Sequence, residues 1–159
     1  RQVTCLLFAG DFLGLAKQDT YAFSAEAVTP STLCRFSRHK LENLMQRLPK
    51  IEQCLLGIAS NELVAAQEQM LLLGRKTARE KIASFLLMLA KRARQRGQGD
   101  GPVSVPMSRT DIGDYLGLTT ETVSRTITQL KQKGTIQLLP NHRMNLADRE
   151  ALEEIAGGF

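Results

Sequence analysis

Glu121, Ser124 and Arg125 are the residues whose types and spacing best fit a chemical task. Ser124 and Arg125 follow Glu121 by three and four positions, so on an α-helix both lie on the same face as Glu121. Arginine can donate two hydrogen bonds to guanine O6 and N7, and glutamate can accept one from cytosine N4. Glu121 and Arg125 can also hold each other in place, or form only a surface ion pair. The spacing therefore predicts a helix face that reads base edges, with Thr120 as a fourth candidate.

The segment around that face has the spacing of a helix-turn-helix. Thr110 can cap a first helix, and Gly113 is small enough to let another helix cross closely. Gly117 can supply the left-handed backbone of a tight turn. A second helix is expected from about Thr120 to Lys133, with Thr128 on the same face as the base-reading candidates. The inward positions of the two helices are expected to be Ile112, Leu116, Val123, Ile127 and Leu130.

A hairpin with a basic tip is expected after Gly134, because Thr135–Leu139 and Met144–Leu146 flank a turn over Pro140–Arg143. Such a wing can lie along a phosphate backbone, and a small amphipathic helix over Asp148–Ala156 follows it. Contacts to phosphate position a protein on DNA without reading its sequence, although each basic side chain could also be plain solvated surface. The phosphate-contact candidates are Arg109, Thr119, Lys131, Lys133 and Arg143.

A long helix, from Pro49 to about Leu73, carries apolar residues at heptad spacing. No charged residue interrupts this stripe, which predicts a parallel pair of helices across a two-fold axis. The alternative is a helix buried on two sides within one subunit. A second apolar stripe (Ile51, Leu55, Ile58 and Ala65) can cover the chain's own preceding domain. The positions of the first stripe, called the seam below, are Leu56, Ala59, Leu63, Ala66, Met70 and Leu73.

Local signals place the remaining helices. Ser37 can cap a short helix that ends near Arg47, and Pro49 suits the first turn of the next helix. Residues 74–77 are expected to form a hinge. Thr77 and Glu80 fit a capping box that opens a helix reaching about Arg96. A glycine-rich turn and a short strand over Val103–Val105 then lead to the helix-turn-helix.

Residues 1–36 resemble the end of a β domain, with strands expected over Val3–Phe8, Tyr21–Val28 and Ser31–Phe36. The chain starts at Arg1 in what reads as a strand already under way. We therefore expect a fragment that has lost its N-terminal part.

Charge is distributed unevenly along the 159 residues. Residues 1–74 hold 7 basic and 7 acidic side chains, whereas residues 75–159 hold 14 and 9 and account for the net charge of +5. A basic second half indicates a polyanionic partner, or merely a basic surface. The apolar runs are too short for a membrane span. Three cysteines without a Cys-x-x-Cys pair favour a reduced, cytoplasmic protein and no disulfide framework.

Several stretches together resemble the FNR branch of the CRP/FNR bacterial transcription regulators, with FixK-type proteins nearest. The similarity covers nearly the whole chain. It includes Phe8–Gly14, the seam helix and Ala78–Ala83, and it is most specific over Arg109–Arg125, where the Glu-x-x-Ser-Arg run lies. The cyclic-AMP branch usually has glycine at the position of Ser124, which favours the FNR branch.

The resemblance implies an α+β protein: the remnant of an N-terminal β-roll (residues 1–48), a dimerisation helix (49–74) and a C-terminal winged helix-turn-helix (75–159). It implies a homodimeric activator that binds double-stranded DNA and recruits RNA polymerase. Its target would be an inverted repeat of TTGAT-like half-sites, read by residues that match Glu121, Ser124 and Arg125.

The resemblance also raises two ligand questions. Cyclic-nucleotide regulators hold the phosphate with an Arg-Ser pair, but the matching stretch here is Tyr21-Ala22-Phe23, so a phosphate would have no partner. Oxygen-sensing relatives carry a cluster ligand at the position of Cys34. A [4Fe–4S] cluster needs four thiolates and this chain has three, so we expect no cofactor or metal in this chain. Cys34 remains a candidate ligand if an N-terminal cysteine cluster precedes it, and Cys5 and Cys54 are expected to pack as small apolar groups.

Other functions would make different demands on the residues. A non-specific architectural DNA-binding protein would need only the basic half, and a cyclic-nucleotide-responsive regulator would need the missing phosphate partners. An enzyme is not expected, because His39 and His142 lie far apart and no nucleophile motif, phosphate loop or metal spacing accompanies them.

Overall fold

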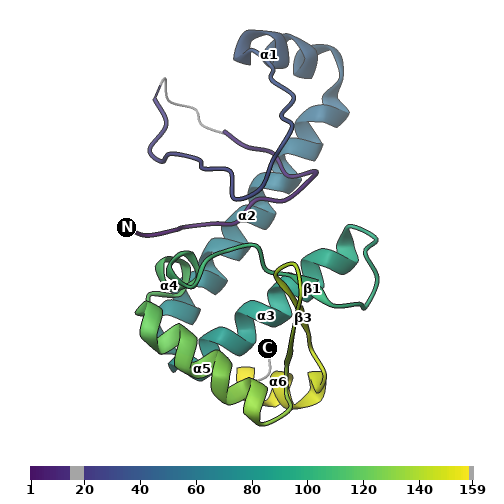
Figure 1. Ribbon diagram of the computed structural model, residues 1–159. Coiled ribbons are helices and arrows are strands. Elements are labelled where there is room, and N and C mark those ends of the chain that lie inside the picture. Colours follow the sequence, from purple (N-terminus) through teal and green to yellow (C-terminus); the bar gives the residue numbers. More distant parts are fainter. Residues whose placement is uncertain (15–19, 158–159) are drawn as a thin grey trace. The chain divides into compact units, whose positions relative to one another are not determined.

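The computed structural model describes residues 1–14 and 20–157 and divides into two compact units. One unit comprises Gly10–Gln69, and the other comprises Arg1–Ala9 together with Met70–Phe159. The sequence assigned the first nine residues to the first domain, whereas here they group with the C-terminal unit. The protein contains both helices and a small antiparallel sheet (Figure 1), which agrees with the expected α+β class.

The unit Gly10–Gln69 contains α1 (Arg38–Arg47) and most of α2 (Pro49–Arg75). Ser37 caps α1 as predicted, because its side chain accepts a hydrogen bond from the backbone N–H of Lys40. Pro49 occupies the first position of α2, where its missing N–H costs nothing. The helix is longer than expected at its C-terminus, since Gly74 and Arg75 continue it and the hinge narrows to Lys76 and Thr77.

The three strands expected before α1 do not form. Val3–Phe8, Tyr21–Val28 and Ser31–Phe36 have no strand hydrogen bonding. A strand is stable only when a neighbouring strand satisfies its backbone groups, and none of the described residues supplies a partner for these segments. The backbone N–H of Val3 instead donates to the carbonyl of Asp114 at 3.1 Å.

The seam of α2 is largely solvent-exposed. Leu56, Leu63 and Met70 are 68%, 61% and 64% exposed. Ala66 is exposed and Ala59 is half-buried, while Ile51, Leu55 and Ile58 of the second stripe are half-buried and Ala65 is exposed. The chain therefore does not bury α2 on both sides.

At the last turn of α2, residues that were exposed along the seam give way to residues packed against the C-terminal unit. Leu72 is buried in the core of the C-terminal unit, and the seam residue Leu73 packs against that core. A Cβ placed on Gly117 would lie 3.4 Å from the Leu73 side chain, so this leucine lies against the helix-turn-helix of the same chain. Leu73 is therefore a seam position that the structure assigns to packing within the C-terminal unit.

In the C-terminal unit, α3 (Ala78–Gln95) is the central helix (Figure 1). It opens with the predicted capping box, in which Thr77 accepts from the Glu80 backbone and the Glu80 carboxylate accepts from the Thr77 backbone. Its buried residues include Ile82, Phe85 and Leu86. The helices α5 (Thr120–Gln132) and α6 (Arg149–Ala156) pack against α3. Asp148, expected as the first residue of α6, is instead its N-cap.

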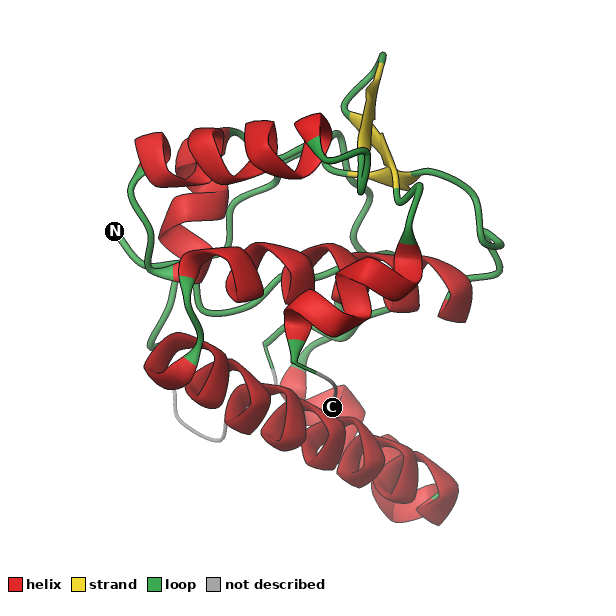
Figure 2. Ribbon diagram, turned by 90° about the horizontal axis from the view of Figure 1, so that it is seen from below, coloured by secondary structure: helices red, strands yellow, loops and turns green. Residues whose placement is uncertain are grey.

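Three short strands, yellow in Figure 2, form the sheet. Their order is β1-β3-β2. They are β1 (Val103–Ser104), β2 (Gln137–Leu139) and β3 (Arg143–Asn145), and all neighbours are antiparallel. The β2–β3 hairpin is the predicted wing. At its tip, between the paired residues Leu139 and Arg143, Asn141 and His142 adopt φ of 59° and 54°, positive values that asparagine and histidine adopt more readily than most residues.

The N-terminal residues of this unit lie against α3 and α4 (Arg109–Leu116). The guanidinium groups of Arg92 and Arg96 lie 5.3 and 4.3 Å from the centre of the Phe8 ring. No helix in the described part of the chain is long and apolar enough to cross a membrane.

Candidate nucleic-acid interface

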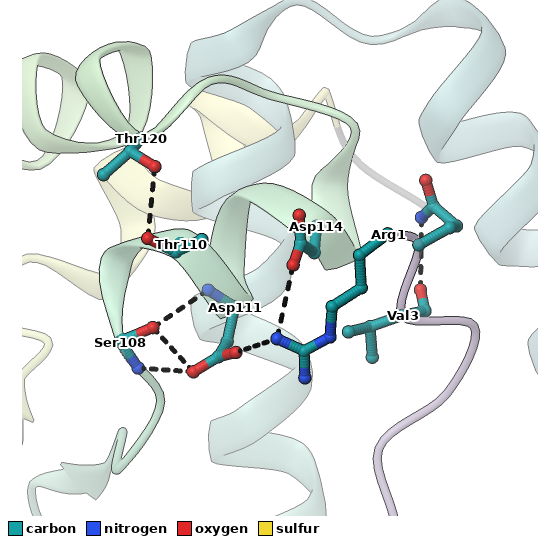
Figure 3. A network of polar contacts seen from close by, with 8 residues as sticks. Arg1, Val3, Ser108, Thr110, Asp111, Asp114 and Thr120 are labelled. Carbon is teal, nitrogen blue, oxygen red and sulfur yellow. Dashed lines mark hydrogen bonds and ion pairs between the residues drawn. The ribbon is translucent and has the colours of Figure 1, made fainter. Parts of the chain in front are cut away.

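The first helix of the helix-turn-helix is α4. Its N-cap is Ser108 and not Thr110, the residue that the sequence analysis predicted. The Ser108 hydroxyl oxygen accepts from the Asp111 backbone N–H at 3.1 Å, and the Asp111 carboxylate accepts from the Ser108 hydroxyl and backbone at 2.6 and 3.1 Å (Figure 3). This reciprocal pairing is a capping box, which a threonine at position 110 cannot make, since residue 113 is glycine. The prediction of Thr110 as the cap was wrong.

The carboxylate of Asp111 is also electrostatically stabilised. Its hydrogen bond from the Ser108 hydroxyl lowers its pKa below the ordinary value of 3.8, and the backbone bond from Ser108 and the guanidinium of Arg1 act in the same direction. Arg1 lies 2.9 Å from Asp111 and 3.5 Å from Asp114 (Figure 3). The N-terminal turn of α4 is therefore held by a charged network.

Thr110 has a different role from the one predicted. Its hydroxyl oxygen lies 3.3 Å from that of Thr120, so a hydrogen bond joins the first turn of α4 to the first residue of α5 (Thr120–Gln132) (Figure 3). The two helices are thus tied where both begin. No spacing pattern in the sequence indicated this contact, because the two threonines are ten residues apart on different helices.

The turn between the helices depends on two glycines. Gly117 ends α4 with φ of 63° and ψ of 43°, as predicted. Gly113 is essential for another reason than the one expected: a Cβ there would lie 2.5 Å from the Leu118 carbonyl oxygen. The turn's own backbone, rather than a crossing helix, therefore excludes a side chain at position 113.

Thr119 caps α5. Its hydroxyl oxygen accepts from the Thr122 backbone N–H at 3.1 Å and lies 2.8 Å from the Thr122 hydroxyl. When Thr122 is the donor of the second bond, the Thr119 O–H is left to donate outward. Thr119 is exposed, so capping and the predicted phosphate contact are compatible.

The two faces of α5 separate as the sequence predicted. Val123, Ile127 and Leu130 are buried, and Thr126, which the sequence pattern did not single out, is buried beside them. The opposite face is solvent-exposed. Its residues are Thr120, Glu121, Ser124, Arg125 and Thr128.

The charged pair on this face is not locked together. Within the described residues no ion pair joins Glu121 to Arg125. Both side chains therefore keep their hydrogen-bonding groups for an external partner. The expectation that each holds the other in position is not met.

The basic candidates surround α5. Lys131 and Lys133 are exposed at its C-terminal end, and Arg143 is exposed on β3, paired in register with Leu139 across the wing. Arg109, the first residue of α4, is half-buried, and burial lowers its pKa from the ordinary value. Three of the four cations are thus fully available to a polyanion, and the fourth is partly covered.

The three cysteines all lie on exposed parts of the chain. Cys5, Cys34 and Cys54 are all exposed, so the prediction that Cys5 and Cys54 pack as apolar groups was wrong. Within residues 1–14 and 20–157, no group of three or more histidine, cysteine, aspartate or glutamate side chains is arranged so that it could hold a metal ion. These residues alone cannot supply four thiolates, and the role of Cys34 as one ligand stays a prediction.

Comparison with known proteins agrees with this geometry. Residues 80–155 match the Crp-like helix-turn-helix domain. The chain is 44% identical over 161 residues to the transcriptional activator protein FnrL of Cereibacter sphaeroides, a match covering 99% of this chain and 65% of that protein. It is 37% identical over 156 residues to the nitrogen fixation regulation protein FixK of Rhizobium meliloti, covering 98% of this chain and 68% of that protein.

A solved structure gives the same answer. FixK2 from Bradyrhizobium japonicum matches with a TM-score of 0.68 at 40% identity, over 74% of this chain and 58% of that one. The chain spans 65% of the length of FnrL, so the likeness covers nearly all of this chain but only part of the relative. With the helix-turn-helix and wing described above, these matches confirm the resemblance seen in the sequence: the chain belongs to the CRP/FNR superfamily, in its FNR/FixK branch.

Proposed function

We propose that the protein is a dimeric, sequence-specific DNA-binding transcription regulator of the FNR/FixK type. The observation that carries this proposal is the face of α5: Glu121, Ser124 and Arg125 are exposed together on a helix that is capped at its start and buried on its other side. A rigid helix with unpaired polar groups on one face suits the major groove.

The chemistry of this face fits a TTGAT-like half-site. Such a half-site contains one G·C pair, which presents the guanine acceptors and the cytosine amino donor in the major groove. Arg125 donates to guanine O6 and N7, while Glu121 accepts from cytosine N4. Ser124 can donate or accept, and Thr120 is the exposed residue that precedes Glu121.

Around the reading face, cations contact the phosphate backbone. Lys131 and Lys133 lie at the end of α5, and Arg143 lies on the wing. Their exposure lets each replace condensed counterions on DNA, and partly covered Arg109 adds a fourth contact. These contacts set orientation and not sequence preference.

Dimerisation follows from the seam of α2. Large apolar side chains at Leu56, Leu63 and Met70 are exposed at heptad spacing, and a second copy would bury them. Two copies related by a two-fold axis would present two α5 helices to successive major grooves, with half-sites about 10–10.5 bp apart from centre to centre.

Recruitment of RNA polymerase is the last part of the proposal, supported by relatives such as FnrL, which is named a transcriptional activator. In transcription with purified components, adding the protein should raise transcript yield from a promoter that carries the inverted repeat. Equal yield with and without the repeat would refute this part.

The main test is selection of bound duplexes from a random pool at fixed salt. The proposal predicts a two-fold symmetric consensus with one G·C pair in each half-site. The alternative is a non-specific architectural DNA-binding protein, favoured only by the basic C-terminal half. That alternative predicts affinity that depends steeply on salt without any consensus.

A further inference from the structure

Lys76 is the first residue after α2 and directly precedes Thr77, the N-cap of α3. Its Nζ donates a hydrogen bond to the Ser84 hydroxyl oxygen at 2.8 Å and another to the Ala156 carbonyl oxygen at 2.7 Å. Ser84 is buried on α3, and Ala156 is the last residue of α6. One ammonium group therefore connects the end of α2, the central helix and the end of α6.

The acceptor on α6 is a carbonyl group at the C-terminal end of that helix. The last carbonyls of a helix have no partner within the helix and carry partial negative charge. Gly157 satisfies the carbonyls of Glu153 and Glu154, and Lys76 satisfies that of Ala156. Burial lowers the pKa of Lys76, opposed by the carboxylate of Glu80, so the ammonium is partly withdrawn from water.

Apolar contacts alone would leave this junction poorly defined. Leu72 is buried in the core and Leu73 packs near Gly117, but such contacts are not directional and allow a helix to rotate or slide. Two short hydrogen bonds from a charged donor fix both distance and direction. Since α3 also packs against α5, fixing the last turn of α2 (Met70–Arg75, which belongs to the C-terminal unit) to α3 fixes that turn relative to α5, the recognition helix.

We infer that Lys76 is a positioning residue that sets the distance between the two recognition helices of the dimer, and thereby the half-site spacing that the protein accepts. This inference rests on the proposed function. In a dimer joined through α2, any rotation at Lys76–Thr77 moves each α5 relative to the two-fold axis. A loosened junction would let the two helices adapt to repeats of the wrong spacing and would weaken binding to the right one.

The test compares affinities for three duplexes: the inverted repeat with the selected spacing, the same half-sites with one base pair inserted, and a single half-site. Lys76→Met keeps an unbranched side chain but removes both hydrogen bonds. The matched control is Arg75→Met, which removes the same charge from an exposed neighbour. Thermal unfolding of each variant establishes that it is folded.

For Lys76→Met we expect the affinity for the selected repeat, divided by the affinity for the lengthened repeat, to fall about tenfold. The free energy of one hydrogen bond to a charged group is large enough to account for a change of this size. Half-site affinity should stay within about twofold, because the reading face is untouched. Arg75→Met should preserve the wild-type ratio. A merely structural role for Lys76 would lower all three affinities together and leave the ratio unchanged, which would overturn the inference.

Two further outcomes of this experiment also have a defined meaning. If Lys76→Met does not fold, Ser84→Ala removes one acceptor and should lower the spacing ratio in the same direction, by less; an unchanged ratio would overturn the inference. If the wild-type protein itself shows no preference for an inverted repeat, the proposed function fails, independently of Lys76.

Discussion

The Leu118 carbonyl lies against Gly113 so closely that a Cβ on this glycine would come within 2.5 Å of the carbonyl oxygen. The same two residues share a hydrogen bond, since the Leu118 N–H donates to the Gly113 carbonyl at 2.9 Å. Backbone therefore packs directly on backbone at the point where α4 turns into α5. The angle at which the reading face is presented depends on this contact.

Gly113→Ala should destabilise the protein by about 1–3 kcal/mol, because the new methyl group meets a backbone atom that cannot rotate away. Urea unfolding measures the loss, and specific DNA binding should weaken as the turn opens. Gly74→Ala is the matched control, since nothing lies within 4 Å of a Cβ there. Equal stability of the two variants would show that the turn accommodates a side chain.

Leu63→Glu should convert the dimer to a monomer. Leu63 is an exposed residue near the middle of the seam, and facing carboxylates across a two-fold axis would be desolvated and repel each other. Sedimentation velocity measures the change in mass. Val64→Glu places the same charge on an exposed residue of α2 outside the seam and should leave the dimer intact. If both variants remain dimers, the seam is not the dimer interface.

Lys133→Ala should weaken binding to all duplexes alike. Because each lost phosphate contact releases one fewer counterion, the slope of log affinity against log salt should become shallower by about 0.9. The control is Lys91→Ala, which removes an exposed lysine of α3 that is not a phosphate candidate. An altered base preference in Lys133→Ala would mean that this residue reads sequence.

The capping carboxylate of α4 should make stability depend on acid pH. Since the folded protein holds the pKa of Asp111 below its ordinary value of 3.8, ionised Asp111 stabilises the fold fully above that value, and this contribution is lost as pH falls through the folded pKa. The difference in free energy of unfolding between wild type and Asp111→Asn should therefore be constant near neutrality and shrink below about pH 3.8. Chemical denaturation across this range measures it, and a difference that grows with acid would contradict the sign.

Local patterns in the sequence were sufficient for most of the helices. Ser37, Thr77 and Gly117 act as caps or turn residues as predicted, because capping and left-handed turns depend on residues within four positions of one another. The cap of α4 was predicted wrongly as Thr110, although the sequence contained the local signal for Ser108. Asp111, three residues after Ser108, completes a capping box with it.

Features that depend on distant residues could not be predicted in this way. The strands expected near Val3 and Ser31 need neighbours that no local pattern supplies. The bond between Thr110 and Thr120 joins two helices, and Lys76 reaches a carbonyl 80 residues away. The base-reading face was predictable because a helical period fixes it, whereas the contacts that orient it were not.

The most direct test of the account is the base preference of Arg125→Ala on the selected inverted repeat, measured by competition at constant salt. The account predicts that discrimination at the guanine of each half-site falls by about 1–3 kcal/mol, with other positions and the salt dependence nearly unchanged. Undiminished preference for guanine would show that this face of α5 does not read DNA.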